Sequence, residues 1–169
     1  KRIPKCHIIS GENKMTKILV TGGCGFIGSN LVDLLVEDED NEVVVIDNLD
    51  TGKKENCNNK ALYLFEDIRD VFTRNGSVLH EHEKMLQSID VIFHLAALAR
   101  IQPSFERQCE TMDINAGGTA LVCEFARKSN AKVIYSGSSS FYGGVYLNPY
   151  SFAKWQGEEI CKMYSEVYG

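Results

Sequence analysis

Residues 17–28 constrain the fold of this chain most strongly, because an apolar run is followed there by three glycines at fixed spacing. The run Lys17–Thr21 (KILVT) predicts a buried strand, and TGGCGFIG continues from it directly into a helix predicted over Gly25–Glu37. Gly22 permits a tight turn, Gly25 lets backbone N–H groups approach a pyrophosphate, and Gly28 lets helix and strand pack closely. The helix N-terminus adds partial positive charge, so the segment predicts a dinucleotide-phosphate site.

The rest of the chain alternates between short apolar runs and longer segments with helical spacing. The runs rich in β-branched residues predict strands at Lys17–Thr21, Glu42–Ile46, Ala61–Phe65, Asp90–Leu95 and Lys132–Ser136. Helices are predicted over Gly25–Glu37, Glu81–Ser88 and Ser104–Ser129, and from about Tyr150 to the end. In the first helix the expected buried stripe comprises Phe26, Ile27, Leu31, Leu34 and Leu35. Alternating helices and strands that are apolar on both faces predict an α/β fold with a doubly wound parallel sheet.

Length and charge restrict the class of protein further. The 169 residues, 44% of them apolar, suit one globular domain. Residues 1–14 are polar and aperiodic and precede Met15, so we expect an extension upstream of the natural start, with the domain at residues 15–169. The net charge of −5 offers no field for a nucleic acid. No apolar run approaches the roughly 20 residues of a membrane helix, so no membrane contact and a cytoplasmic location are expected.

Cysteine and histidine spacings indicate no metal centre. The six cysteines never form a Cys-x-x-Cys pair, and we interpret them as reduced thiols. His80 and His82 lack supporting cysteine or carboxylate ligands at suitable spacing, so a metal is not expected there. His94, within a predicted strand, is interpreted as a packed histidine and not as an acid or base.

A carboxylate ends the second predicted strand. Asp47 lies 19 residues beyond Gly28, where it could accept hydrogen bonds from both adenosine ribose hydroxyls and would repel a 2′-phosphate. That position favours NAD over NADP. The alternative is an ordinary turn or helix-capping aspartate in the DNLDTG segment at residues 47–52.

Tyr150 and Lys154 are four residues apart and therefore share a face of the last predicted helix. An ammonium beside a phenol favours the phenolate, which makes the tyrosine a usable general base. By itself the spacing is common in purely structural helices. The serine-rich segment at residues 136–143, however, follows the fifth strand and brings hydroxyls to the sheet edge where ligands of open α/β folds bind.

Seven motifs in order resemble the extended short-chain dehydrogenase/reductase family, and more narrowly its NAD-dependent nucleotide-sugar epimerase/dehydratase branch of the UDP-glucose 4-epimerase type. They are TGGCGFIG at 21–28, DNLDTG at 47–52, EDIRD at 66–70, HLAA at 94–97, NAGGT at 115–119, SSSFYG at 138–143 and YSFAK at 150–154. The resemblance covers residues 17–169 and implies an NAD-binding Rossmann domain without the family's C-terminal substrate domain.

The resemblance also implies roles for individual residues. The implied cofactor-binding residues are Gly22, Gly25, Phe26 and Ile27 at the pyrophosphate, Asp47 and Asn48 at the ribose, Asp67 and Ile68 at adenine, and Leu95, Ala96 and Ala97 at nicotinamide. Asn115 would order the active site, although a helix-packing role is equally compatible with the sequence. Ser138, Tyr150 and Lys154 fall on the family's catalytic residues, and Tyr150 and Lys154 also on its cofactor-binding residues.

The implied reaction is epimerisation of a nucleotide-sugar, most simply a UDP-sugar, by transient oxidation at C4. Tyr150 would take the hydroxyl proton, Ser138 would hold the oxygen and Lys154 would steady the phenolate. Relatives that eliminate water or carbon dioxide carry an acidic residue where this chain has Ser138–Ser140, which favours epimerisation or keto-sugar reduction over dehydration and decarboxylation. A dehydratase, a keto-sugar reductase and a non-catalytic dinucleotide-binding module remain as alternatives.

The chain departs from the family at two places. Only six residues, 144–149, separate the Tyr-Gly motif from Tyr150, where members carry a longer loop. Complete members also continue beyond the position of Gly169, so we expect this chain to be a fragment, and isolated it could lack activity. Members often pair through two long helices, here Ser104–Ser129 and Tyr150–Tyr168, which makes a homodimer the expected assembly.

Overall fold

A parallel five-stranded sheet forms the centre of the molecule. The computed structural model describes residues 15–169, so the expected extension at residues 1–14 lies outside the described part. The strands are β1 (Thr16–Thr21), β2 (Asn41–Ile46), β3 (Leu62–Leu64), β4 (Val91–His94) and β5 (Lys132–Tyr135), and their order is β3-β2-β1-β4-β5. All four pairings are parallel, as predicted. The order reverses direction beside β1, which places the topological switch point at the end of β1 and β4.

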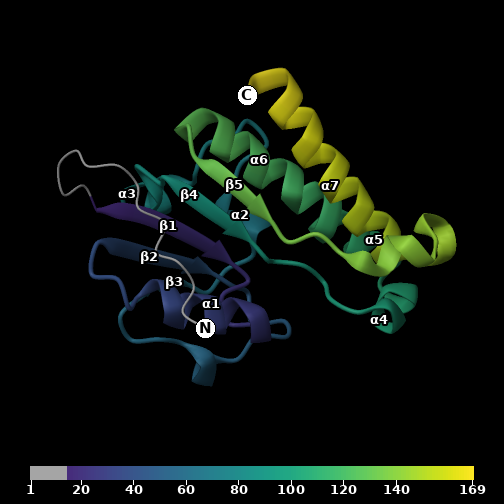
Figure 1. Cartoon of the computed structure of the whole chain (residues 1–169), viewed down its shortest axis with the longest axis horizontal. Helices are drawn as coiled ribbons and strands as arrows, with labels where there is room; N and C mark the ends of the chain where they lie inside the picture. The colour runs from purple at the N-terminus through teal and green to yellow at the C-terminus, as the bar shows by residue number, and fades with distance from the viewer. Residues whose placement is uncertain (1–14) are drawn as a thin grey trace, which may run out of the picture.

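Helices cover both faces of the sheet (Figure 1). They are α1 (Phe26–Leu35), α2 (Ile68–Val71), α3 (Glu83–Leu86), α4 (Ile101–Glu106), α5 (Gln108–Met112), α6 (Gly118–Ser129) and α7 (Pro149–Tyr168). The long helices α6 and α7 lie side by side, and α1 lies on the opposite side of the sheet (Figure 1). The predicted α/β class with a doubly wound parallel sheet is thus confirmed.

Alternate residues of the strands supply two separate cores. Leu19 packs with Ile92, Phe72 and Phe125 on the α6 side. Its neighbour Val20 faces the α1 side, where the other core lies. Each core excludes water from one face of β1 and β2, which explains why the central residues of these strands are apolar on both faces.

The edge strand β5 departs from the predicted burial on both faces. Lys132 is exposed and Ile134 is 42% exposed, because β5 has a neighbour on one side only among residues 15–169. The apolar pattern of β5 therefore indicates strand propensity, and not complete burial within this chain.

The expected stripe of α1 is wrong at Phe26, Ile27 and Leu34, although Leu31 and Leu35 do pack against the core. The buried face of the helix contains Gly28, Ser29 and Val32, whereas Phe26 and Ile27 are 85% and 64% exposed. Leu34 is likewise exposed. The small residues face the sheet because α1 packs closely against the glycine loop, and two large apolar side chains are left at the helix start.

The predicted helix Ser104–Ser129 is divided in the structure. A first piece, α4, begins three residues earlier than predicted, and the chain leaves helical geometry at Arg107 (φ −115°, ψ 47°) before α5. A π-helical turn, Asp113–Gly117, then joins α5 to α6. Such a turn inserts an extra residue and changes which side chains face inward. Here it turns Asn115 into the protein, where only 1% of that residue is exposed.

The last predicted helix is confirmed as α7. The Asn148 side chain accepts a hydrogen bond from the backbone N–H of Ser151 at 2.8 Å, and Pro149 occupies the first helical position. Both features are typical of helix starts. Within residues 15–169, no helix combines the length and apolar character needed to cross a membrane.

A candidate dinucleotide site at the carboxyl edge of the sheet

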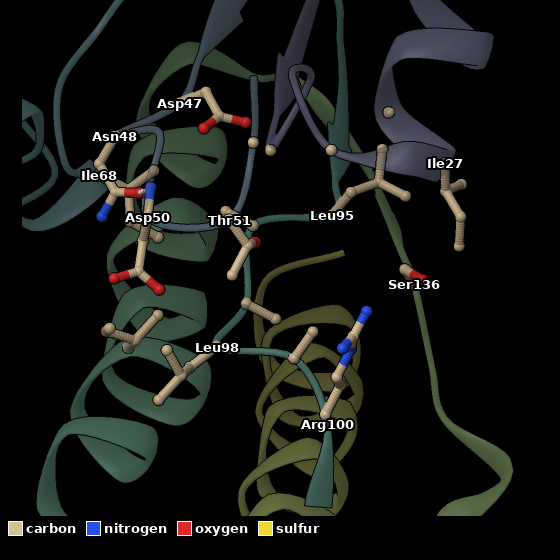
Figure 2. A pocket seen from close by; sticks show the side chains of 18 of the residues that line it. Ile27, Asp47, Asn48, Asp50, Thr51, Ile68, Leu95, Leu98, Arg100 and Ser136 are labelled. Atoms are coloured by element: carbon tan, nitrogen blue, oxygen red, sulfur yellow. Dashed lines mark hydrogen bonds between the residues drawn. The ribbon is translucent and has the colours of Figure 1, made fainter. Parts of the chain in front are cut away.

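A cavity of about 750 Å³ opens at the carboxyl ends of β1, β2, β4 and β5. Figure 2 shows side chains from several separate segments around it. The predicted site residues that line the cavity are Gly22, Gly25, Phe26, Ile27, Asp47, Asn48, Asp67, Ile68, Leu95, Ala96, Ala97, Tyr150 and Lys154. Its volume falls within the range of about 300–1,000 Å³ found for ligand pockets. Two predicted residues, Asn115 and Ser138, are not part of this lining.

The glycine loop forms one wall of the cavity without side chains. Gly22 has φ +76°, and a Cβ atom there would lie 2.7 Å from the backbone nitrogen of Ala96. A Cβ at Gly28 would collide with the Gly22 carbonyl oxygen. Gly25 precedes α1, and no side chain caps this helix start. The first N–H groups of α1 are therefore available to an anion at the cavity wall, which fits the pyrophosphate of a dinucleotide.

Asp47 lies at the end of β2 and is 8% exposed. One carboxylate oxygen accepts a hydrogen bond from the Cys24 N–H at 2.9 Å, and the other accepts from the Leu49 N–H at 2.8 Å. Each carboxylate oxygen has two lone pairs, so each can accept one further bond. The Asp47 side chain therefore stabilises the turn and can still accept hydrogen bonds from a ligand in the cavity (Figure 2). The two hydroxyls of a ribose require such an acceptor.

Asp67 connects the cavity to a charged network. Its carboxylate accepts from the Asn48 side-chain amide at 3.0 Å and pairs with two nitrogens of Arg69, each at 2.9 Å. These bonds, mainly those from Arg69, hold the pKa of Asp67 below its usual value. Arg69 also pairs with Asp113 in the π-helical turn. The network fixes the loop after β3, which presents Ile68 to the cavity.

His94 is a packed histidine, as interpreted from the sequence, with 1% of its surface exposed. The Thr119 hydroxyl donates to the Asn115 carbonyl at 2.6 Å, which leaves it to accept from His94 Nε2 at 3.1 Å. His94 Nδ1 then accepts from the Thr21 hydroxyl at 2.7 Å, and Thr21 accepts from the Ala96 N–H at 3.2 Å. Burial lowers the pKa of His94 to about 3, so the ring is neutral and satisfied on both sides.

Asn115 fixes the loop that follows β4. Its side-chain oxygen accepts from the Leu98 N–H at 2.7 Å, and its amide donates to the Leu98 carbonyl at 3.2 Å. This pair of bonds holds the cavity wall formed by residues 95–100 from behind. The structure therefore gives Asn115 a positioning geometry and places it outside direct reach of the cavity.

Tyr150 and Lys154 enter the cavity from the first turns of α7. The backbone N–H of Tyr150 donates to the buried Ser104 hydroxyl at 3.2 Å, which anchors α7 to α4. Lys154 is 5% exposed, and its Nζ lies 4.2 Å above the centre of the Tyr135 ring. Burial lowers the pKa of Lys154 to about 8, so the ammonium is mostly charged at neutral pH but poised to lose its proton.

Ser138 lies just outside the cavity. Its hydroxyl donates to the Ser140 hydroxyl at 2.9 Å and caps the 3₁₀-helix Ser139–Gly143. The neighbouring residues Ser136 and Gly137 do line the cavity. The structure thus brings Tyr150 and Lys154 to the glycine loop and leaves Ser138 at the rim.

Sequence reasoning missed two arginines of the cavity wall. Arg100 has φ +83°, and its side chain points into the cavity (Figure 2). Arg107 forms ion pairs with Asp50 and Glu110. The sequence around Arg107 continues a helical pattern and therefore gives no indication of the non-helical backbone that the structure shows there.

A carboxylate and histidine cluster lies beside the cavity, where Glu66, Glu81 and His82 come together and Glu66 also lines the cavity. His82 lies 3.0 Å from Glu66 and 3.5 Å from Glu81, whereas His80 pairs with Glu83 instead. His80 and His82 therefore do not act together. The structure therefore gives His82 the carboxylate neighbours that the sequence spacing did not predict.

The fold and this cavity define a dinucleotide-binding α/β protein of the Rossmann type. The profile of the NAD dependent epimerase/dehydratase family matches residues 18–169, and the chain belongs to that family. NAD is the cofactor that the family's description states, and the glycine loop and Asp47 fit it.

Named relatives agree with this membership. The chain is 37% identical over 142 residues to UDP-glucuronic acid decarboxylase 3 of Arabidopsis thaliana, covering 82% of this chain and 38% of the relative. It superposes with a TM-score of 0.79 and 30% identity on UDP-glucose 4-epimerase of Thermotoga maritima, solved with UDP-glucose, covering 91% of this chain and 52% of that structure. For UDP-glucuronic acid 4-epimerase of Bacillus cereus, solved with UDP-glucuronic acid and NAD, the TM-score is 0.76, the identity 30%, and the coverage 90% and 53%. The chain spans 30% to 52% of the length of the curated relatives compared with it and about half the length of the solved structures.

Proposed function

We propose that these residues form the NAD-binding half of an epimerase that inverts C4 of a nucleotide-sugar, with a UDP-sugar as substrate. One observation carries the proposal: Tyr150 and Lys154 line the same cavity as the uncapped start of α1. A general base, Tyr150, and a dinucleotide site would then share one cavity. The related enzymes of known substrate act on UDP-sugars, which supports the choice of nucleotide.

In the proposed mechanism, Tyr150 as phenolate accepts the proton of the C4 hydroxyl. The glycine loop and Asp47 would hold NAD, which would supply reversible hydride transfer at C4 of the sugar. Lys154 stabilises the phenolate through its charge, which the pKa of about 8 leaves largely intact at neutral pH. Ser138 holds the reacting oxygen. This role requires its hydroxyl to leave Ser140 and to rotate toward the cavity.

Two enzymatic alternatives are weaker. Dehydration or decarboxylation needs a further acid or base, and Ser138–Ser140 offers none, although decarboxylases are among the relatives. A keto-sugar reductase would consume NADH, whereas an epimerase returns every hydride. A homodimer through α6 and α7 is part of the proposal, and analytical ultracentrifugation checks it.

The alternative from another class is a dinucleotide-binding module without turnover. The rim position of Ser138 favours this alternative, and the joint placement of Tyr150 and Lys154 argues against it. Tyr150→Phe in the full-length protein decides between them. We expect loss of sugar conversion with NAD affinity retained. An unchanged rate would refute Tyr150 as the base.

A further inference from the structure

Two thiols meet behind the cofactor cavity. Cys24 belongs to the glycine loop. Cys57 lies 33 residues later in the chain, directly after the 3₁₀-helix Lys54–Asn56. Their sulfur atoms are 3.6 Å apart. A disulfide has an S–S distance of about 2.05 Å, so closure requires a relative movement of about 1.5 Å.

The backbone around the pair is held together by independent contacts. The Cys24 carbonyl accepts hydrogen bonds from the Lys53 N–H at 3.1 Å and from the Asn56 side-chain amide at 2.8 Å. The segment that carries Cys57 is therefore attached to the glycine loop through the Cys24 carbonyl, at two residues that shortly precede Cys57. This attachment keeps the two sulfur atoms close without a covalent bond.

The two thiols differ in accessibility. Cys24 is fully buried, whereas Cys57 is half-buried and can be reached from solvent. Burial, together with the charge of Asp47, raises the pKa of Cys24 to about 12, so it remains a protonated thiol at neutral pH. Cys57 is thus the residue that meets an oxidant first, and Cys24 lies in position to react with the product.

We propose that Cys24 and Cys57 form a reversible disulfide under peroxide stress and that this cross-link weakens NAD binding. The Cys57 thiolate attacks one oxygen of hydrogen peroxide, the O–O bond breaks and water leaves after protonation, which gives a sulfenic acid. The Cys24 sulfur then attacks the sulfenic sulfur, the S–O bond breaks, and the second water leaves with the thiol proton. One peroxide is reduced to two waters, and two thiols are oxidised to one disulfide.

The cross-link acts on NAD through the groups next to Cys24. The Cys24 N–H donates to Asp47 at 2.9 Å, and Gly25, its neighbour, lines the cavity. At Gly52 a Cβ would come within 2.9 Å of the Cys24 Cβ and 2.8 Å of an Asp47 oxygen, so there is little room for Cys24 to move alone. Movement of the Cys24 sulfur toward Cys57 therefore shifts the loop and the Asp47 carboxylate together.

A second thiol pair provides an internal control. Cys123 on α6 and Cys161 on α7 have sulfur atoms 3.8 Å apart and lie outside the dinucleotide cavity. Oxidation at this pair joins two helices without touching the glycine loop. Cys161→Ser is therefore the matched control for Cys57→Ser.

The test treats the purified full-length protein with hydrogen peroxide, alkylates the remaining free thiols and identifies linked peptides by mass spectrometry. NAD affinity is measured by titration calorimetry before oxidation, after oxidation and after reduction with dithiothreitol. We expect a Cys24–Cys57 peptide, NAD affinity lowered at least fivefold, and recovery on reduction. Cys161→Ser should behave like the wild type, and Cys57→Ser should keep its affinity through the treatment.

Each other outcome overturns a stated part of the proposal. If Cys24 and Cys57 are alkylated separately after treatment, the disulfide is refuted. If the linked peptide forms with NAD affinity unchanged, or if Cys57→Ser loses affinity equally, the effect on the cofactor is refuted. The effect on affinity rests on the NAD site described above. If the reduced protein does not bind NAD, that site is refuted. The peptide analysis still decides whether the cross-link forms.

Discussion

Lys154→Met should stabilise the protein, because the wild type buries a cation at this position. The pKa of Lys154 falls from 10.5 to about 8, and at about 1.4 kcal/mol per pKa unit the charged form costs about 3 kcal/mol of stability at pH 7. Loss of the contact between the ammonium and the Tyr135 ring offsets about 1 kcal/mol of this gain. The expected net increase in the free energy of unfolding is about 2 kcal/mol.

The lowered pKa of Lys154 also predicts how the stability difference between the two proteins changes with pH. Between pH 8 and 10.5 the unfolded lysine still binds its proton while the folded lysine has lost it, so wild-type stability rises with pH. The advantage of Lys154→Met therefore shrinks by about 2 kcal/mol between pH 7 and pH 9.5. Other groups titrate equally in both proteins, so they cancel in the difference.

Urea unfolding followed by Trp155 fluorescence measures the free energy of unfolding and its dependence on pH, since the chain has one tryptophan. Lys162→Met on the same helix is the control, because Lys162 is exposed and should change stability by less than about 0.5 kcal/mol. A destabilised Lys154→Met protein, or a gain that is independent of pH, would refute the argument from burial.

Three further substitutions test the cavity wall. Gly22→Ala forces a side chain into φ +76° and against the opposite loop, and should lower NAD affinity at least tenfold in calorimetry, whereas Gly143→Ala, with open space around it, should not. Asp47→Asn should reduce the preference for NAD over NADP at least tenfold in competitive binding, and an unchanged ratio would exclude Asp47 from the ribose site. Asn115→Ala leaves the N–H and carbonyl of Leu98 unpaired and should lower the free energy of unfolding by about 3 kcal/mol in urea titrations; a loss below about 1 kcal/mol would contradict the positioning geometry.

The architecture could be predicted because its determinants are local in sequence. Apolar runs of fixed length predict the strands, and Gly22 and Gly28 meet steric requirements that other residues violate. The position of the cavity follows from the parallel arrangement, because the carboxyl ends of parallel strands meet at one edge of the sheet. His94 was correctly interpreted as packed, since a strand between apolar neighbours leaves little room for a solvated ring.

The features that sequence reasoning missed depend on contacts between distant segments. Arg107 leaves helical geometry and pairs with Asp50, which lies 57 residues earlier in the chain. The π-helical turn that buries Asn115 lies inside the segment Ser104–Ser129, which the sequence predicts as one continuous helix. The exposed Phe26 and Ile27 fit a helical apolar stripe, yet the requirement for close packing at Gly28 selects a different face of α1. In each case tertiary packing overrides a local pattern.

Turnover of UDP-sugars by the full-length protein tests the central claim most directly. The assay incubates the protein with UDP-, GDP- and dTDP-sugars, reads products by NMR and follows added NADH by absorbance. The proposed function predicts a UDP-sugar product inverted at C4, with no net consumption of NADH and no loss of water or carbon dioxide. Net oxidation of NADH, an eliminated product, or no conversion of any sugar by a protein that binds NAD would contradict it.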